Sequence, residues 1–130
     1  MPDPAAPPRR LGWLPGRYAV ALAPDGVVPD GEWLALVRGP EGLTVVRPAT
    51  PDDADRWAAL FEATPHGLDV PGMLAAVVGP IAAAGIPVFV TSTHDADLVL
   101  VPAGRRADAA DALRSSGIAV DAVGPEHAAG

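Results

Sequence analysis

Short apolar runs separated by turn residues dominate the first half of the chain. The run at 17–22 is followed by two Pro-Asp-Gly sequences, and such turn chemistry favours a strand. Two further apolar runs, 33–38 and 43–47, are joined by Gly-Pro-Glu-Gly, which is typical of a β-hairpin. The polar, acidic segment 48–56 either forms one helical turn or simply connects the two halves. The first half is therefore predicted to be mostly β-structure.

Four apolar runs in the second half are also typical of β-strands. They are residues 57–62, 86–93, 97–101 and 118–123. Segments with helical periodicity separate the first two runs and the last two, whereas only a short turn separates the middle two. The predicted order is β, α, β, β, α, β, which is the order of a ferredoxin-like module.

The two helices are predicted from apolar spacing and from residues that start or stop a helix. In the first helix, Asp69 is placed as the N-cap and Pro71 in the first turn, while Pro80 is expected to kink the helix and Gly85 to end it. The second helix is expected over 105–116. The apolar stripe of the first helix follows the i, i+3, i+4, i+7 spacing and comprises Met73, Leu74, Val77, Val78 and Ile81.

These patterns divide the chain into two halves with short ends. We expect a disordered arm at 1–11, a smaller, mostly β half at 12–56, the βαββαβ module at 57–123 and a flexible tail at 124–130. Two helices on one face of a sheet leave the other face uncovered, and the first half is expected to extend or cover that sheet. The predicted fold class is α+β.

Composition and charge exclude several classes of function. The 130 residues include 9 basic and 16 acidic side chains, and the formal net charge of −7 argues against binding to nucleic acid or to an anionic membrane. The absence of Cys excludes a disulfide framework and a cysteine nucleophile, and the absence of Lys excludes a Schiff base and a Walker-type phosphate loop. No membrane-spanning stretch or signal peptide is found, so a cytoplasmic location is expected.

The sequence contains no recognisable catalytic motif, and we expect no cofactor and no enzymatic activity. His66 and His127 have no neighbouring acid or nucleophile in the sequence. His94, Asp95 and Asp97 superficially resemble a metal cluster, but three ligands within one hairpin turn cannot all converge on a single ion. No metal site is therefore predicted.

Two runs in the second half carry a family resemblance: AGIPVFV at 84–90 and STHDAD at 92–97. With the apolar strand that follows, they resemble the ACT domain, a βαββαβ amino-acid-sensing module attached to biosynthetic enzymes. More narrowly, they resemble the small stand-alone bacterial ACT proteins related to the CASTOR arginine sensors. The run EGLTVV at 41–46 and Trp57 also resemble that branch. The resemblance covers about residues 14–122 and implies that the mostly β half is itself ACT-like.

The resemblance implies a ligand site, because ACT relatives bind an amino acid in the groove between two paired modules. The loop into the first helix of one module and the second strand of its neighbour meet the ligand. In this chain those positions are Gly67, Leu68, Asp69, Val70 and Gly72 on one side and Val90, Thr91, Ser92 and Thr93 on the other. Helix N-terminal N–H groups suit a carboxylate, and Asp69 or Asp97 suits an ammonium or guanidinium group. Gly72 lets a ligand approach the backbone closely.

The leading hypothesis is a non-enzymatic, allosteric regulatory protein. It is expected to bind an amino acid or similar small zwitterion between ACT modules, to form a homodimer and to act on a protein partner. A second hypothesis is a ligand-independent assembly module, and a third is a small enzyme that uses Asp and His side chains. The chain departs from its relatives at 70–72, where Val-Pro-Gly replaces a common Leu-Thr-Gly, and at His94, which occupies an aromatic position.

Overall fold

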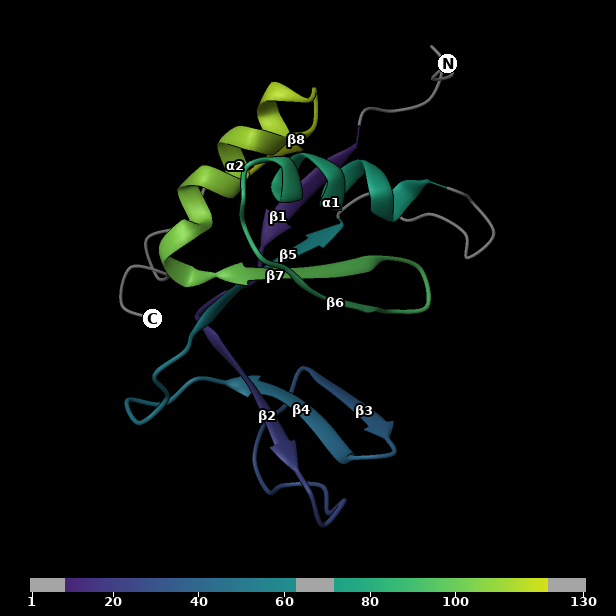
Figure 1. The fold of residues 1–130 in the computed structure, drawn as a ribbon, viewed down its shortest axis with the longest axis vertical. Coiled ribbons are helices and arrows are strands. Elements are labelled where there is room, and N and C mark those ends of the chain that lie inside the picture. The colour runs from purple at the N-terminus through teal and green to yellow at the C-terminus, as the bar shows by residue number, and fades with distance from the viewer. Residues whose placement is uncertain (1–8, 63–71, 122–130) are drawn as a thin grey trace.

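The computed structural model describes residues 9–62 and 72–121, which fold into strands and two α-helices joined by turns and loops (Figure 1). The predicted α+β class is confirmed. The strands are β1 (Arg10–Trp13), β2 (Tyr18–Ala23), β3 (Ala35–Gly39), β4 (Gly42–Pro48), β5 (Trp57–Glu62), β6 (Phe89–Ser92), β7 (Asp97–Pro102) and β8 (Ala119–Val120). The helices are α1 (Met73–Ala83) and α2 (Arg106–Ser115), and a 3₁₀ turn, Ala103–Arg105, leads into α2.

Five strands in the order β6-β7-β5-β1-β8 form a layer with both helices on one face (Figure 1). Side chains alternate along β5, so that Ala58 and Leu60 point to the helices, where Val99 and Val101 of β7 join them. Helix residues that complete this core are Val77, Ile81, Ala109, Ala110 and Leu113. The predicted βαββαβ order from β5 to β8 is thus observed.

The N-terminal strand differs from the prediction. Residues 9–11 were expected to belong to a disordered arm, but Arg10–Trp13 forms β1, and Leu11 is only 3% exposed. β1 lies between β5 and β8, antiparallel to the first and parallel to the second. The sequence RLGW is too short to show a strand periodicity, so its pairing depends on the two neighbours that it joins.

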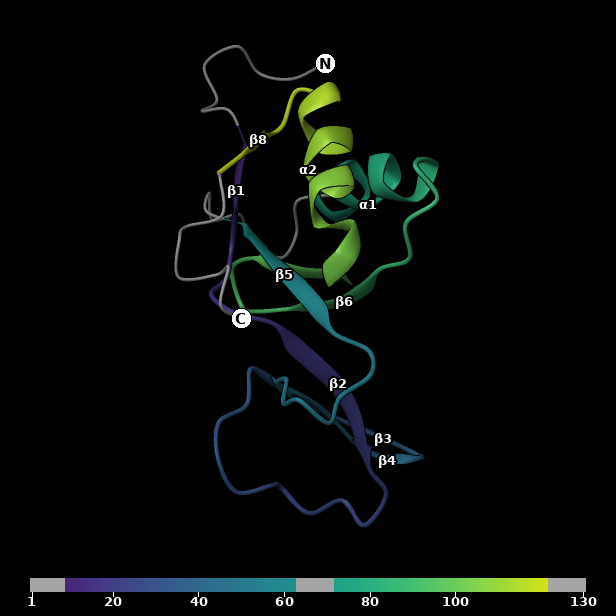
Figure 2. The same ribbon diagram turned by 90° about the vertical axis from the view of Figure 1, so that its left-hand side faces the viewer.

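The strands β2, β4 and β3 form a second layer on the face of β5 and β7 that lacks helices (Figure 2). A single bridge pair, Tyr18 with Trp57, connects this layer to β5. Ala59, Leu98 and Leu100 pack against Val46 between the layers. As predicted, the first half covers the second face of the sheet.

Several element boundaries also differ from the predictions. The segment 48–56 forms turns without a helix, and the strand expected over 86–93 is limited to β6. Helix α1 contains Pro80 as expected, and Gly85, with φ of +76°, follows its last turn. The predicted N-cap Asp69, Pro71 and the tail at 124–130 lie outside the described residues. No helix in the described part of the chain is long and apolar enough to cross a membrane.

Candidate functional site

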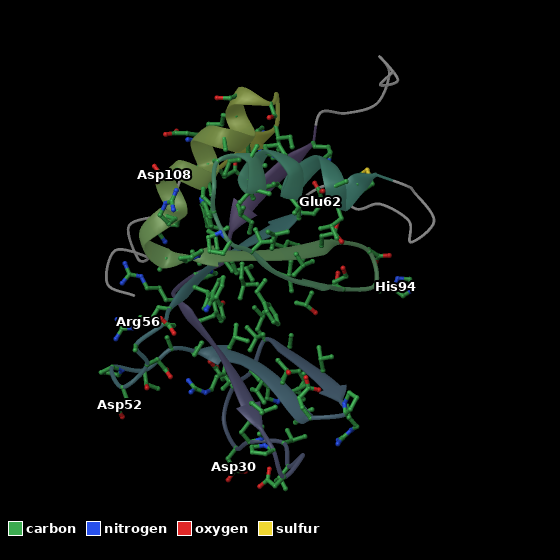
Figure 3. All side chains as sticks on the ribbon, viewed as in Figure 1. Asp30, Asp52, Arg56, Glu62, His94 and Asp108 are labelled. Atoms are coloured by element: carbon green, nitrogen blue, oxygen red, sulfur yellow. The ribbon has the colours of Figure 1, made fainter. Side chains whose placement is uncertain are left out.

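Two carboxylates lie opposite each other on neighbouring strands, where β5 ends and β7 begins. Phe61 pairs with Leu98, so the next residue of β5, Glu62, lies opposite Asp97 on the face that carries the helices. Glu62 is 2% exposed and Asp97 is 9% exposed. Figure 3 shows Glu62 below α1, at the same end of the sheet as the β6–β7 turn that carries His94. This end of the sheet therefore concentrates buried negative charge.

Arg9 binds the first of these carboxylates. Its Nε donates to Glu62 Oε1 at 3.1 Å, its Nη2 forms an ion pair with the same oxygen, and its Nη1 donates to the carbonyl of Met73 at 2.6 Å. Arg9 thus connects the start of β1 to the first turn of α1. The second oxygen, Glu62 Oε2, is buried and accepts no hydrogen bond from the described residues. Because a buried carboxylate oxygen without a donor is costly, this atom suits an N–H group of a ligand.

The STHDAD run, residues 92–97, forms the tight β6–β7 turn, and the side chain of Asp97 at its end is buried. Ser92 Oγ donates to Asp97 Oδ1 at 3.0 Å across the β6–β7 hairpin. The amide of Thr93 donates to the carbonyl of Ala96 at 2.8 Å, and the amide of Ala96 donates to Thr93 Oγ1 at 3.1 Å. The side chains of Asp97 and Ser92 therefore lie on the same face of the sheet as Glu62.

His94 and Asp95 point to solvent instead. Their side chains are 86% and 68% exposed, and His94 Nδ1 lies 2.8 Å from Asp95 Oδ1. Since Asp97 is buried, the three side chains do not converge. Within residues 9–62 and 72–121, no group of three His, Asp or Glu side chains is arranged to hold a metal ion.

The structure places five further predicted ligand residues. Gly72, with φ of +78°, precedes α1, and its carbonyl accepts from the amide of Ala76 at 3.1 Å. On β6, Val90 packs into the helix-side core, whereas Thr91, paired with Leu98, faces the second layer. Ser92 and Thr93 are exposed at the end of the hairpin.

The other predicted positions, Gly67, Leu68, Asp69 and Val70, lie outside the described residues. In the part of the chain that the structure describes, β6 pairs only with β7. No described strand pairs with its other edge.

Sequence reasoning missed Glu62 and Arg9. The strand sequence WAALFE contained a usable signal, because Ala58, Leu60 and Glu62 share one face by strict alternation, which puts a carboxylate in line with core residues. Arg9 gave no such signal, since it precedes a strand that the sequence pattern did not predict.

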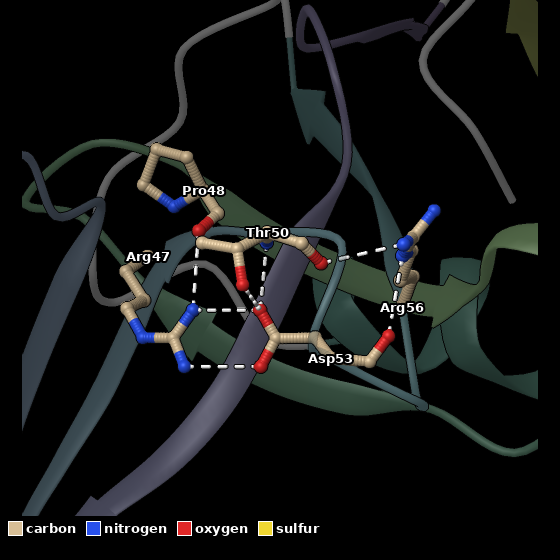
Figure 4. Close-up of polar contacts among 5 residues, drawn as sticks. All are labelled: Arg47, Pro48, Thr50, Asp53 and Arg56. Carbon is tan, nitrogen blue, oxygen red and sulfur yellow. Dashed lines mark hydrogen bonds and ion pairs between the residues drawn. The ribbon is translucent and has the colours of Figure 1, made fainter.

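A second group of charged residues lies at the opposite end of β5, in the loop from β4 (Figure 4). Arg47 donates from Nη1 and Nη2 to Asp53 Oδ2 and Oδ1 at 2.8 and 3.0 Å. The amide and hydroxyl of Thr50 donate to Asp53 Oδ2 at 2.7 and 3.2 Å. The hydrogen bonds from Arg47, and then that from the Thr50 amide, hold the pKa of Asp53 well below its usual range. Asp53 thereby fixes the loop.

Comparison with known proteins finds a family match in the second half of the chain. Residues 54–115 match the family model of the ACT domain, and this match includes β5, α1, the β6–β7 hairpin and α2. ACT domains are generally regulatory domains that bind small molecules. The predicted resemblance to the ACT domain is confirmed for this part of the chain.

Two solved structures are similar over most of the chain. Protein Atu0741 from Agobacterium tumefaciens is 28% identical with a TM-score of 0.76, over 89% of this chain and 94% of that one. The Vibrio cholerae protein VC0802, described as a protein of unknown function and possible transport protein, is 21% identical with a TM-score of 0.66, over 79% of this chain and 85% of that one. Both likenesses extend beyond the ACT match, into the first half. No curated protein matches the sequence.

Proposed function

We propose that the protein is a non-enzymatic regulator that binds an amino acid or similar zwitterion beside Glu62 and Asp97. The ACT match supports a regulatory small-molecule site. The buried carboxylates lie at the end of the sheet where the N-terminal end of α1 and the β6–β7 turn come together. The single observation that carries the proposal is Glu62 Oε2, a buried anionic oxygen that accepts no hydrogen bond from the described residues.

The surroundings of this oxygen suit the two charged groups of a zwitterion. An ammonium group of the ligand donates to Glu62 Oε2, in a site screened from water where a charged hydrogen bond is strong. The ligand carboxylate is attracted to the N-terminal end of α1, which begins after Gly72 without a side-chain cap. Arg9 and Ser92 hold the two protein carboxylates in position.

A second module completes the proposed site. The free edge of β6 supports pairing with another copy of the chain, and we propose a homodimer with the ligand at the interface between modules. A ligand that contacts both modules stabilises one arrangement of them, and a protein partner responds to that arrangement. The narrower relationship to the CASTOR sensors and the ACT-like character of 12–56 stay predictions.

The test is a thermal-shift panel of the twenty amino acids at millimolar concentration. A ligand at 100 times its dissociation constant adds about 2.7 kcal/mol to the free energy of unfolding, which shifts the melting temperature by several degrees. We expect one or a few amino acids to stabilise the protein. A flat panel contradicts the proposal.

Matched variants locate the site. Glu62→Gln keeps an oxygen for Arg9 but places an amide N–H₂ where Oε2 lies, so it should repel an ammonium group and weaken binding by tenfold or more, about 1.4 kcal/mol. Asp97→Asn should also weaken binding. Asp95→Asn is the control, because Asp95 is exposed in the same turn. Unchanged affinity in both Glu62→Gln and Asp97→Asn would rule out this site.

The second candidate is a ligand-independent assembly module. Exposed apolar side chains gather in the first half, at Leu22, Val27, Val28, Trp33 and Val37, and β6 has a free edge. A dimer that no amino acid stabilises would favour this candidate.

A further inference from the structure

Two arginines line adjoining cavities at the other end of β5, away from Glu62 and Asp97. One cavity of about 380 Å³ lies between Gly16–Arg17 and the loop residues 48–51, with Arg56 in its wall. A second, of about 400 Å³, is formed by Arg17, Arg56, Asp53–Ala54 and the Ala103–Gly104 turn. Arg17 and Arg56 line both, so the two cavities meet at these guanidinium groups.

Neither guanidinium group is neutralised by a carboxylate within the described residues. Among residues 9–62 and 72–121, Arg17 Nε is buried and donates to no acceptor, and Arg17 forms no ion pair. Arg56 donates from Nε to the carbonyl of Asp53 and from Nη2 to the carbonyl of Thr50, both at 3.3 Å. Carbonyl oxygens satisfy hydrogen bonds but leave the positive charge of Arg56 in place. The buried Arg17 Nε lacks even that partner, which is costly unless a ligand supplies an acceptor.

The carboxylates of the neighbouring loop do not neutralise these arginines. Both oxygens of Asp53 are engaged by Arg47 and Thr50 (Figure 4). Asp52 and Asp55 are exposed, and neither lines the cavities. Positive charge therefore remains at this junction although the whole chain carries a net charge of −7.

The turn that leads into α2 forms part of the wall of the second cavity. The second cavity reaches Ala103 and Gly104, in the turn that leads into α2, and no side chain caps that turn. The amide of Ala103 donates to the carbonyl of Arg56 at 2.9 Å, which fixes the turn against the arginine-bearing loop.

We propose that Arg17 and Arg56 form a second binding site, one that takes the oxyanion group of a small metabolite, either a phosphate or a carboxylate. Planar guanidinium groups bind such oxyanions with paired hydrogen bonds. The cavity volumes are of the size of small-molecule pockets. The site lies where β2, the β4–β5 loop and α2 meet, so an occupant would tie the first half to the ACT domain.

The experiment is isothermal titration of the full chain with inorganic phosphate and, separately, with succinate, each at constant ionic strength set by chloride. We expect saturable binding of at least one of them. Saturation by phosphate alone assigns a phosphate-bearing metabolite, and saturation by succinate alone assigns a carboxylate. No saturation in either titration overturns the proposal.

Arg17→Gln provides the matched variant, because Arg17 Nε has no hydrogen-bond partner among the described residues that the substitution would remove. It should weaken binding by tenfold or more, while Arg17→Lys, which keeps the charge but not the planar donor set, should weaken it less. Arg38→Gln is the control, since Arg38 is exposed on β3 and lines neither cavity. Equal affinity in Arg17→Gln and Arg38→Gln would also overturn the proposal. The titrations and the variant comparison do not depend on whether an amino acid binds beside Glu62 and Asp97.

Discussion

The two ends of the β5–β7 strand pair carry opposite charge and bury it to different depths. Glu62 and Asp97 are in the sheet itself and lie under α1, whereas Arg17 and Arg56 are in connecting segments that line open cavities. Strand alternation fixes the acidic side chains among core residues, so their partners contribute to folding. The arginines have few protein partners, so changing them should affect binding more than stability. Charge held among core residues, as at Glu62, therefore contributes to stability as well as to a binding site, whereas charge beside an open cavity contributes mainly to binding.

The largest expected effect comes from removing the partner of the buried acid. Arg9→Ala leaves Glu62, whose side chain is fully buried, without its ion pair, and should lower the free energy of unfolding by about 3 kcal/mol. Arg10→Ala is the control, because Arg10 is 61% exposed and its pair with Asp121 should contribute less than about 1 kcal/mol. Urea denaturation of both variants measures the difference. If both variants lowered the free energy of unfolding equally, the buried ion pair of Arg9 with Glu62 would contribute no more to stability than the exposed pair of Arg10.

A smaller effect is expected in acid, at the loop beside the arginines. The pKa of Asp53 is held below its ordinary value of 3.8, so its ion pair stabilises the folded protein above that pH. As the pH falls below 3.8 towards the lower pKa of the folded state, this contribution is lost. Asp53→Asn should therefore flatten the acid dependence of the urea midpoint. An unchanged acid slope in the variant would contradict the role of Asp53.

The smallest effect is expected where a charged pair is exposed on a helix. Arg105 Nε lies 2.9 Å from Asp108 Oδ2, and both side chains are largely exposed. Arg105→Ala should change the free energy of unfolding by only about 0.3 kcal/mol, and added salt should reduce that difference further. Urea denaturation at low and high salt measures it. If Arg105→Ala lowered the free energy of unfolding as much as Arg9→Ala does, the exposed Arg105–Asp108 pair would contribute to stability as strongly as the buried pair.

Local sequence patterns predicted most helices and strands, because the strand pairing between distant segments agrees with these local preferences. The hairpin of β3 and β4, the strand β5 and both helices occur where apolar runs, turn residues and i, i+3, i+4 spacing placed them. β1 was missed because four residues show no period, and its stability comes from the strands on each side. The strand expected over 86–93 was too long, because Pro87 and the chain around it lead from α1 into β6 without pairing.

The candidate sites were predicted less completely, because they depend on side chains from distant segments. Asp97 and Ser92 were predicted, and the structure brings them together in one hydrogen bond. Glu62 and Arg9 are 53 positions apart in the sequence, and only the placement of β1 beside β5 brings them into contact. Arg17 and Arg56 belong to two different connections, where sequence periodicity carries no information about which side chains meet.

β1 and β2 follow each other in the sequence but belong to different layers, because β1 lies between β5 and β8. The chain starts in the helix-bearing layer, leaves to build β2, β3 and β4, and returns at β5, so the β2–β4 layer is topologically an insertion. Breaking the chain between Leu14 and Arg17 would therefore not release a domain. It would cut the covalent link between β1 and β2, whereas the pairing of β1 with β5 and β8 and the contact of Arg9 with Glu62 cross the break through space. These contacts make β1 suited to fragment complementation, in which a strand supplied as a separate chain restores the fold.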